Sequence, residues 1–129
     1  MYNLFLDDIR NPKDVYYYIK DNRYLNLDWV VVRSYDEFVS YITENGMPSL
    51  TSFDHDLADE HYGSHLKKEI YYSDFKEKTG FSCAQWLVNY CLDNGYKLPR
   101  YLIHSMNTPG RINIDSYFKT FLRYKDRLH

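Results

Sequence analysis

Groups that bind metals, phosphates or protons follow four short apolar runs of this sequence. Carboxylates hold divalent cations, and the imidazole of histidine exchanges protons near neutral pH. Arginine pairs with phosphate oxygens in a bidentate fashion, and a serine hydroxyl donates a hydrogen bond to the same group. The groups are Asp7 and Asp8, Arg33, Asp54, His55 and Asp56, and His104 and Ser105. Together they predict a site for metal-assisted phosphate chemistry if the fold brings them together.

The acidic members of this set would repel one another if they converged without compensation. Two carboxylates about 4 Å apart repel by roughly 4 kcal/mol at an effective dielectric constant near 20, whereas a whole domain is stable by only about 5–15 kcal/mol. Protonation, neighbouring Arg and Lys side chains, or a divalent ion would each relieve the repulsion, and we favour a divalent ion. The predicted ligands are Asp7, Asp8, Asp54 and Asp56, which suit Mg²⁺ or Mn²⁺. A histidine in the shell would shift the preference toward Mn²⁺.

Each of these groups also has a purely structural interpretation. Asp7 and Asp8 could cap a helix, although the next predicted helix begins later, near Pro12. Residues 54–56 could form a solvated turn. His104 could be a satisfied histidine at a strand end, and Arg33 could pair with a surface carboxylate.

The elements that must position these groups follow from the hydrophobic pattern. Four apolar runs have the length, and several the β-branched or aromatic bias, of strands buried on both faces of a parallel sheet. These runs are residues 3–6, 29–32, 50–53 and 101–103. Helical spacing predicts helices over residues 12–22, from the capping box at Ser34 to Gly46, over 81–94, and over 114–124 after a turn at 107–110.

This alternation predicts an α/β fold: an open, doubly wound, mostly parallel sheet of about four strands in the order 2-1-3-4. That is the flavodoxin-like order without its last strand, in a single domain over residues 1–129. Residues 57–79 contain no convincing strand and are predicted to form an insert or lid.

The predicted topology explains why the strand ends matter. In an open parallel sheet, ligands bind at the carboxyl ends of the strands, where the strand order reverses. Here that point lies between the first and third strands, so Asp7, Asp8 and Asp54 should share one crevice. Arg33 and His104 should lie on the neighbouring strand ends.

The composition excludes several classes of protein. The 129 residues carry a formal net charge of −2 and no strong basic run, which argues against strong binding of duplex nucleic acid. No apolar stretch approaches the ~20 residues of a membrane span, and the acidic N-terminal segment does not read as a secretory signal, so we expect a cytoplasmic protein. Cys83 and Cys91, eight residues apart on one predicted helix, are expected to be buried apolar residues.

At this point the motifs carry a family resemblance. The segments Leu4–Asp8 and Ser52–Asp54 resemble the response-regulator receiver domain, in which an acidic pair binds Mg²⁺ and a third-strand aspartate accepts a phosphoryl group. Ser105 falls where receivers carry a Ser or Thr that contacts that group. The chain departs from receivers in lacking a fifth strand with its lysine, and in carrying the insert.

The departures resemble a divergent subgroup, the cyclic-phosphate processing receiver-like domains. The matching motifs are FLDDIRNP at 5–12, FDHDL at 53–57, Thr79-Gly80, and HSMN at 104–107. Thr108 intervenes where the family pattern places Pro directly after Asn. The resemblance implies processing of cyclic or terminal phosphates, often in RNA repair or phage–host conflict.

The resulting hypothesis is a metal-dependent phosphoesterase acting on a cyclic or terminal phosphate of a nucleotide or RNA end. His104 would protonate the leaving oxygen, and the catalytic set is completed by Asp54 and His55. Substrate phosphate would be bound by Arg33, Arg10, Ser105 and Asn107.

Two other functions remain open. A non-catalytic receiver-like module that binds a phosphate-bearing ligand or partner would need the same acidic pair. His104 and His55 favour the enzyme, because a phosphate sensor needs no residue that titrates near neutral pH. A nucleic-acid-binding accessory protein is the weakest of the three.

Overall fold

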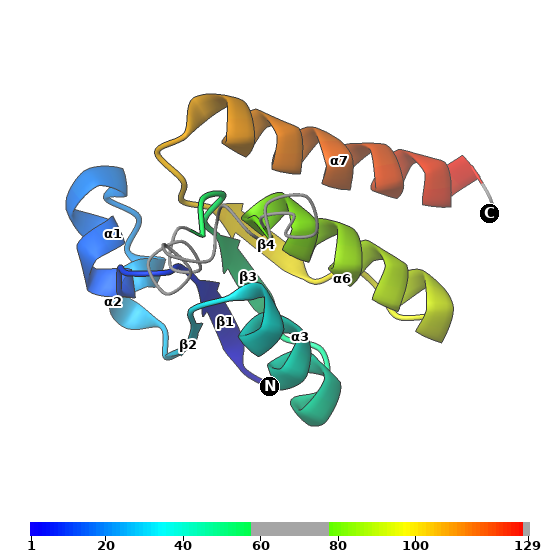
Figure 1. Ribbon diagram of the computed structural model, residues 1–129, viewed down its shortest axis with the longest axis horizontal. Coiled ribbons are helices and arrows are strands. Elements are labelled where there is room, and N and C mark those ends of the chain that lie inside the picture. Colours follow the sequence, from blue (N-terminus) through cyan, green and yellow to red (C-terminus); the bar gives the residue numbers. More distant parts are fainter. Residues whose placement is uncertain (58–77, 128–129) are drawn as a thin grey trace, which may run out of the picture.

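The computed structural model describes residues 1–57 and 78–127 and contains one sheet of four parallel strands. In Figure 1 these are β1 (Asn3–Leu6), β2 (Trp29–Val32), β3 (Leu50–Phe53) and β4 (Arg100–Ile103). Their order is β2-β1-β3-β4, so the predicted doubly wound topology is confirmed.

The strands are in register at their carboxyl ends. Leu6 pairs with Val32 on one side and with Phe53 on the other, and Phe53 pairs with Ile103. The residue that follows each strand therefore lies in one row along the same edge of the sheet. That register brings the polar groups of distant segments to a common place.

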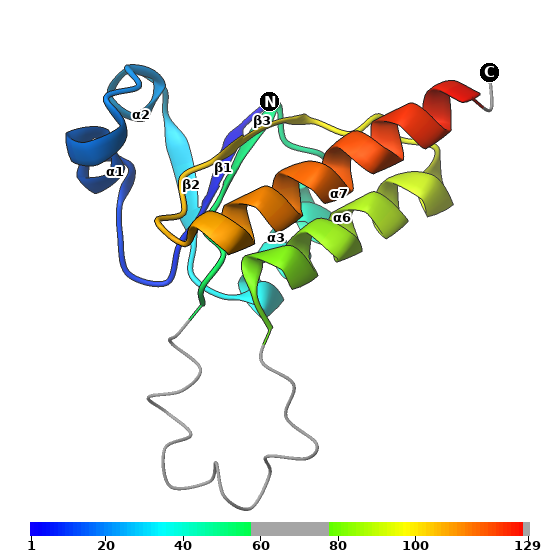
Figure 2. The same ribbon diagram turned by 90° about the horizontal axis from the view of Figure 1, so that it is seen from above.

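Helices cover both faces of the sheet. They are α1 (Pro12–Ile19), α2 (Arg23–Asn26), α3 (Tyr35–Asn45), α6 (Gly80–Asn94) and α7 (Thr108–Arg127). Figure 2 shows α1 and α2 on one side of the sheet and α3, α6 and α7 on the other. This arrangement agrees with right-handed crossovers that move first toward β2 and then back toward β4.

Two cores lie against the two faces because side chains alternate along each strand. Leu4 and Leu6 of β1 belong to the larger core, which includes Phe38, Phe53 and Phe118. The intervening residue of β1, Phe5, points to the smaller core with Val15 and Tyr24. Cys83 and Cys91 are both buried, as predicted.

Two predicted helix boundaries are wrong. The helix predicted over 12–22 ends early, at Ile19, because Lys20 adopts a left-handed conformation with φ of 62°, and a separate helix, α2, begins at Arg23. The helix predicted over 114–124 begins at Thr108, so the predicted turn at 107–110 is instead its N-terminus. Pro109 fits there because the first turn of a helix needs no N–H from it.

The capping box predicted at Ser34 is present in part. The Ser34 hydroxyl accepts the N–H of Glu37 at 3.1 Å, as expected. The Glu37 carboxylate, however, accepts the N–H of Arg33 at 3.1 Å, one residue before the predicted donor. The contact still joins the end of β2 to the start of α3.

The predicted insert or lid at 57–79 falls almost wholly on residues 58–77, which lie outside the described residues. Leu57 at its start is buried in the larger core. In the described part of the chain, no helix is both long enough and apolar enough to cross a membrane.

Candidate functional site

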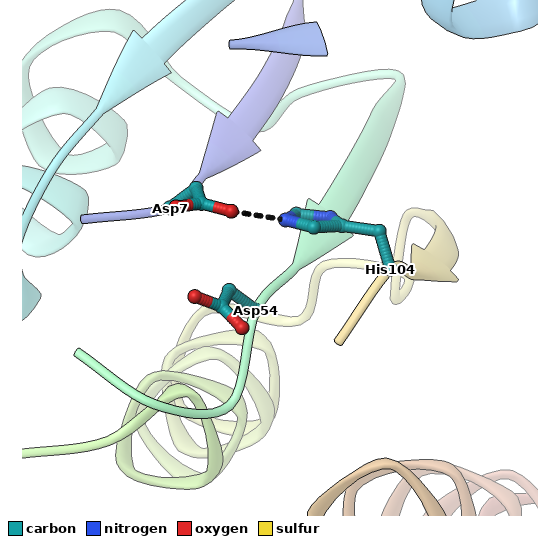
Figure 3. A group of neighbouring side chains, drawn as sticks. All are labelled: Asp7, Asp54 and His104. Atoms are coloured by element: carbon teal, nitrogen blue, oxygen red, sulfur yellow. Dashed lines mark hydrogen bonds and ion pairs between the residues drawn. The ribbon is translucent and has the colours of Figure 1, made fainter. Parts of the chain in front are cut away.

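Three side chains from separate strands meet at the carboxyl edge of the sheet. Asp7 follows β1, Asp54 follows β3 and His104 follows β4 (Figure 3). One potential ligand atom from each lies within 4.8 Å of the others, and all three residues are buried. The register of the strands causes this convergence, although nearly a hundred residues separate Asp7 from His104.

A pocket of about 230 Å³ opens at the same edge. Seven of its lining residues are predicted site residues, and Ile9 and Met106 complete it. The seven are Asp7, Asp8, Arg10, Asp54, Asp56, Ser105 and Asn107. Three predicted residues, His55, Arg33 and His104, are not among the described residues that line the pocket.

Asp7 is held rigidly by hydrogen bonds to both carboxylate oxygens. Its Oδ1 accepts the backbone N–H groups of Ile9 at 2.9 Å and Arg10 at 2.8 Å. Its Oδ2 is 3.0 Å from Nε2 of His104. Burial opposes the charge of Asp7, but the His104 and backbone hydrogen bonds outweigh it and lower the pKa. Asp7 is therefore an ionised and oriented carboxylate.

Asp54 has the opposite electrostatic environment. Its side chain is buried, and the charges of Asp7 and Asp8 lie close by. Burial first, and then these two carboxylates, raise the pKa of Asp54 to about 7. The acids converge as expected, and their repulsion raises the pKa of Asp54 while that of Asp7 stays lowered.

His104 is completely buried beneath Asp7. Its Nδ1 is 2.7 Å from the hydroxyl of Ser52, and its ring stacks on Phe5 with 4.4 Å between ring centres. Burial lowers the pKa of His104 even though Asp7 pulls in the other direction. Both ring nitrogens have partners, so this position does not suit the predicted direct proton donor to a leaving oxygen.

Arg33 follows β2 at the carboxyl edge of the sheet, as predicted, and its side chain contacts the segment that follows β1. Its guanidinium donates to the carbonyl oxygens of Arg10 at 2.6 Å and Asp7 at 3.3 Å, and to Oδ1 of Asn11 at 2.7 Å. The side chain therefore braces the loop between β1 and α1. Neither the predicted phosphate contact nor the alternative surface ion pair describes this role.

His55, Asp56 and Asn107 form a second polar cluster at the pocket margin. Nδ1 of His55 is 2.9 Å from Oδ1 of Asp56, and Nδ2 of Asn107 donates to the same carboxylate at 3.2 Å. The other end of the Asn107 amide, Oδ1, accepts the N–H of Gly110 at 3.0 Å and caps α7. Asn107 thus ties Asp56 to a helix N-terminus and is less suited to the predicted contact with substrate.

Asp56 is consequently separate from the buried acids. Its side chain is 62 % exposed, whereas Asp7 and Asp54 are buried. It lines the pocket but does not belong to the group of closely spaced ligand atoms found among the described residues.

Arg10 and Ser105 lie where a phosphate could meet them. The Arg10 guanidinium carbon is 5.5 Å from the ring centre of Tyr18, and Arg10 lines the pocket. The buried Ser105 hydroxyl accepts the N–H of Asn107 at 3.1 Å, so that bond does not use its own proton.

Several residues that shape the site were not predicted. A Cβ added to Gly80 would lie 1.7 Å from the carbonyl oxygen of Asp54, so only glycine lets α6 begin this close to the end of β3. The sequence shows Gly80 as part of a motif, but it does not show that Gly80 lies so close to Asp54. Ser52 and Tyr24 were not predicted as site residues, because a serine inside an apolar run and a tyrosine among fifteen do not by themselves indicate a role.

The residues fit a divalent cation. Nε2 of His104 is already hydrogen-bonded to Asp7, so the donors that remain for a cation are carboxylate oxygens of Asp7 and Asp54, with Asp8 on the same pocket wall. An oxygen donor set of this kind suits Mg²⁺ or Mn²⁺. A cation would also offset the repulsion that raises the pKa of Asp54.

The chain was compared with models of known protein families, with curated proteins and with solved structures. A family model described as "Cyclic-phosphate processing Receiver domain" matches residues 2–120. This span includes every residue that lines the pocket. No curated protein and no solved structure matches the chain.

Proposed function

The chain belongs to the cyclic-phosphate processing receiver domain family, and we propose that it is a metal-dependent phosphoesterase acting on a cyclic or terminal phosphate of a nucleotide or RNA end. The observation that carries this proposal is the pair of buried carboxylates, Asp7 and Asp54, beneath a pocket that also contains Arg10. A phosphate dianion or diester needs positive charge, and a pair of carboxylates attracts a phosphate only through a cation between them.

In this proposal, Asp7 and Asp54 hold a Mg²⁺ or Mn²⁺ ion, with Asp8 in reach from the pocket wall. The ion would supply positive charge beside the phosphoryl group and polarise its oxygens. Asp7 is suited to the role because its remaining lone pairs are fixed in direction by the bonds from His104 and two amides.

Arg10 and Ser105 bind the non-bridging oxygens of the phosphate. Arg10 places a permanent positive charge at the pocket, and charge-assisted hydrogen bonds to phosphate are about twice as strong as neutral ones. Ser105, which lies just after β4, can donate its hydroxyl proton to the same phosphate.

Proton transfer needs a group at the pocket surface, and the burial of His104 moves that task to Asp56. The Asp56 carboxylate lines the pocket, is exposed, and is oriented by His55 and Asn107. We assign it the exchange of a proton with substrate or water, with His55 as its partner. His104 becomes a positioning residue for Asp7.

A non-catalytic module that binds a phosphate-bearing ligand is the second candidate. One observation favours it: His104, whose titration near neutral pH would mark an enzyme, is buried with both nitrogens hydrogen-bonded. A binding module would retain the cation, Arg10 and Ser105 and would lack turnover.

The test uses Mn²⁺ or Mg²⁺ with 2′,3′- and 3′,5′-cyclic nucleotides and with RNA that ends in a cyclic phosphate. We expect hydrolysis of at least one class by the wild type, with a loss of at least about 100-fold in Asp54→Asn and Asp56→Asn. The control is Asp93→Asn, which removes an exposed carboxylate near the end of α6. Metal-dependent binding of these ligands without turnover would instead identify the module, and turnover that survives Asp54→Asn would contradict the proposed site.

A further inference from the structure

A line of buried polar groups connects α2 to the candidate metal site. The hydroxyl of Tyr24 is 2.7 Å from Oγ of Ser52, and that oxygen is 2.7 Å from Nδ1 of His104. Nε2 of His104 is 3.0 Å from Oδ2 of Asp7. None of the four residues is more than 3 % exposed. The chain of contacts therefore runs wholly inside the protein.

The direction of these hydrogen bonds follows from the acceptor at the end. The Asp7 carboxylate only accepts, so Nε2 of His104 must carry a proton and donate it. In the neutral imidazole the other nitrogen, Nδ1, is then an acceptor, and the hydroxyl of Ser52 must donate to it. Ser52 has a single hydroxyl proton, so Tyr24 must donate to Ser52. The direction of each hydrogen bond therefore determines the direction of the next one in the series.

The imidazole is also prevented from moving. Its ring stacks on Phe5, and the hydroxyl of Tyr18 donates to the backbone carbonyl of His104 at 3.0 Å. Tyr24 stacks in turn on Trp29, with 5.6 Å between ring centres. Rotation of the imidazole would break its contacts with Ser52 and Asp7 together.

This arrangement is more than packing requires. The smaller core is otherwise built from aromatic and aliphatic side chains, and Phe and Ala in place of Tyr24 and Ser52 would leave an apolar core with fewer polar groups to satisfy. Thr51, the neighbour of Ser52 on β3, shows the contrast: its buried hydroxyl has no hydrogen-bond partner among the described residues. Of these two neighbouring hydroxyls on β3, the one of Ser52 is connected to the site.

We propose that Tyr24 and Ser52 are positioning residues of the metal site, which act through His104 to keep its proton on Nε2 and so to orient the Asp7 carboxylate for a divalent cation. This inference rests on the proposed function, because it assumes that Asp7 binds the cation. Residues that hydrogen-bond to a metal ligand commonly affect metal affinity, because they fix the orientation and the basicity of that ligand. The two residues touch neither substrate nor metal.

The experiment measures Mn²⁺ affinity by titration calorimetry in the full chain and compares three hydroxyl deletions. We expect Ser52→Ala to weaken Mn²⁺ binding by about 10-fold or more, and Tyr24→Phe to weaken it in the same direction by less. Thr51→Val removes an equally buried hydroxyl from the same strand and should leave the affinity unchanged. Because Tyr24→Phe deletes a single oxygen atom, it keeps the test available if Ser52→Ala does not fold.

A second readout separates positioning from general destabilisation. Nitrogen-15 NMR of the metal-free wild type should show His104 protonated at Nε2, with Nδ1 as a hydrogen-bonded acceptor. Ser52→Ala should shift the Nδ1 resonance toward that of an acceptor without a donor, and Thr51→Val should leave it in place.

Unchanged Mn²⁺ affinity and an unchanged His104 spectrum in Ser52→Ala would overturn the inference and leave the metal site standing. A reversed tautomer in the wild type would also overturn it. A wild type that binds no Mn²⁺ would overturn the metal site itself and this inference with it, so the two failures give different results.

Discussion

At the scale of single residues, two aspartates that follow the neighbouring strands β1 and β3 differ sharply in their electrostatics. Asp7 accepts three hydrogen bonds and has a lowered pKa, whereas burial and neighbouring charges raise the pKa of Asp54 to about 7. The sequence predicts that these acids converge, but it does not predict which of them has its pKa raised. That depends on where two amides and one imidazole point.

The shift of Asp54 makes the stability of the metal-free protein depend on pH. The folded state binds the Asp54 proton more tightly than the unfolded state, whose carboxyl keeps an ordinary pKa. Its contribution is thus fully present below about pH 4 and is lost as the pH rises through about 7. Between pH 5 and pH 8, this group should lower the free energy of unfolding by about 2 to 3 kcal/mol.

Urea denaturation in EDTA at several pH values measures this effect. Asp54→Asn should remove most of the decline that the wild type shows between pH 5 and pH 8, while Asp93→Asn keeps it. Equal pH profiles for the wild type and Asp54→Asn would show that Asp54 is not the group responsible.

Arg33 gives a second prediction at this scale. Arg33→Ala should destabilise the protein by about 1 to 3 kcal/mol, because two carbonyls and one amide oxygen lose a charged donor. Arg33→Lys should restore little, since a single ammonium cannot reproduce the planar fork of the guanidinium. Thermal and urea unfolding test this. A variant that keeps full stability but loses phosphate affinity would instead support the contact first predicted for Arg33.

His104 illustrates what could not be predicted from the sequence. Its place after a strand correctly suggests proximity to the acids, but its burial depends on Phe5 and Ser52, which lie 99 and 52 positions away in the chain and adjoin it only through the sheet. A strand-end histidine that faces a pocket and one that supports a carboxylate from beneath look alike in sequence.

At the scale of elements, the strands were predicted to within one residue because each is a short apolar run ended by polar groups. The helix boundaries were less accurate where capping depends on distant contacts. α7 begins six residues before the predicted helix, because Asn107 caps it and also binds Asp56. A Thr-Pro-Gly sequence is typical of a turn, so local chemistry alone gave the wrong boundary.

The junction between β3 and α6 yields an element-scale prediction. Gly80→Ala should destabilise the fold by at least about 3 kcal/mol, because the added Cβ would overlap the Asp54 carbonyl at 1.7 Å and neither backbone can yield. The control is Gly95→Ala, where an added Cβ would meet no atom of the described residues within 4 Å beyond its immediate surroundings in the chain, and only the positive φ of 70° carries a cost, about 1 kcal/mol. Similar losses at both glycines in urea denaturation would contradict this account of the junction.

The cap of α7 gives a second prediction at the scale of elements. Asn107→Asp should keep much of the cap through its carboxylate oxygen but repel Asp56, whereas Asn107→Ala should lose both contacts and about 1 kcal/mol of stability. We expect the proposed turnover to fall in both variants, with stability lost mainly in Asn107→Ala. Unaltered turnover in Asn107→Asp would show that the tie to Asp56 has no functional role.

At the scale of the whole molecule, four parallel strands provide one edge at which distant segments of the chain meet. This much follows from alternation of strands and helices and from right-handed crossovers, so the sheet order was predictable. The family match spans residues 2–120, and this span includes every described residue that lines the pocket at that edge.

The central claim is that Asp7 and Asp54 bind one divalent cation. The most direct measurement is the anomalous scattering of Mn²⁺ in crystals of the protein grown or soaked with it at neutral pH. We predict a peak at bonding distance, about 2 Å, from a carboxylate oxygen of each residue, and its absence in Asp54→Asn. A well-ordered site with no peak between these two carboxylates, or Mn²⁺ bound only elsewhere, would contradict the account.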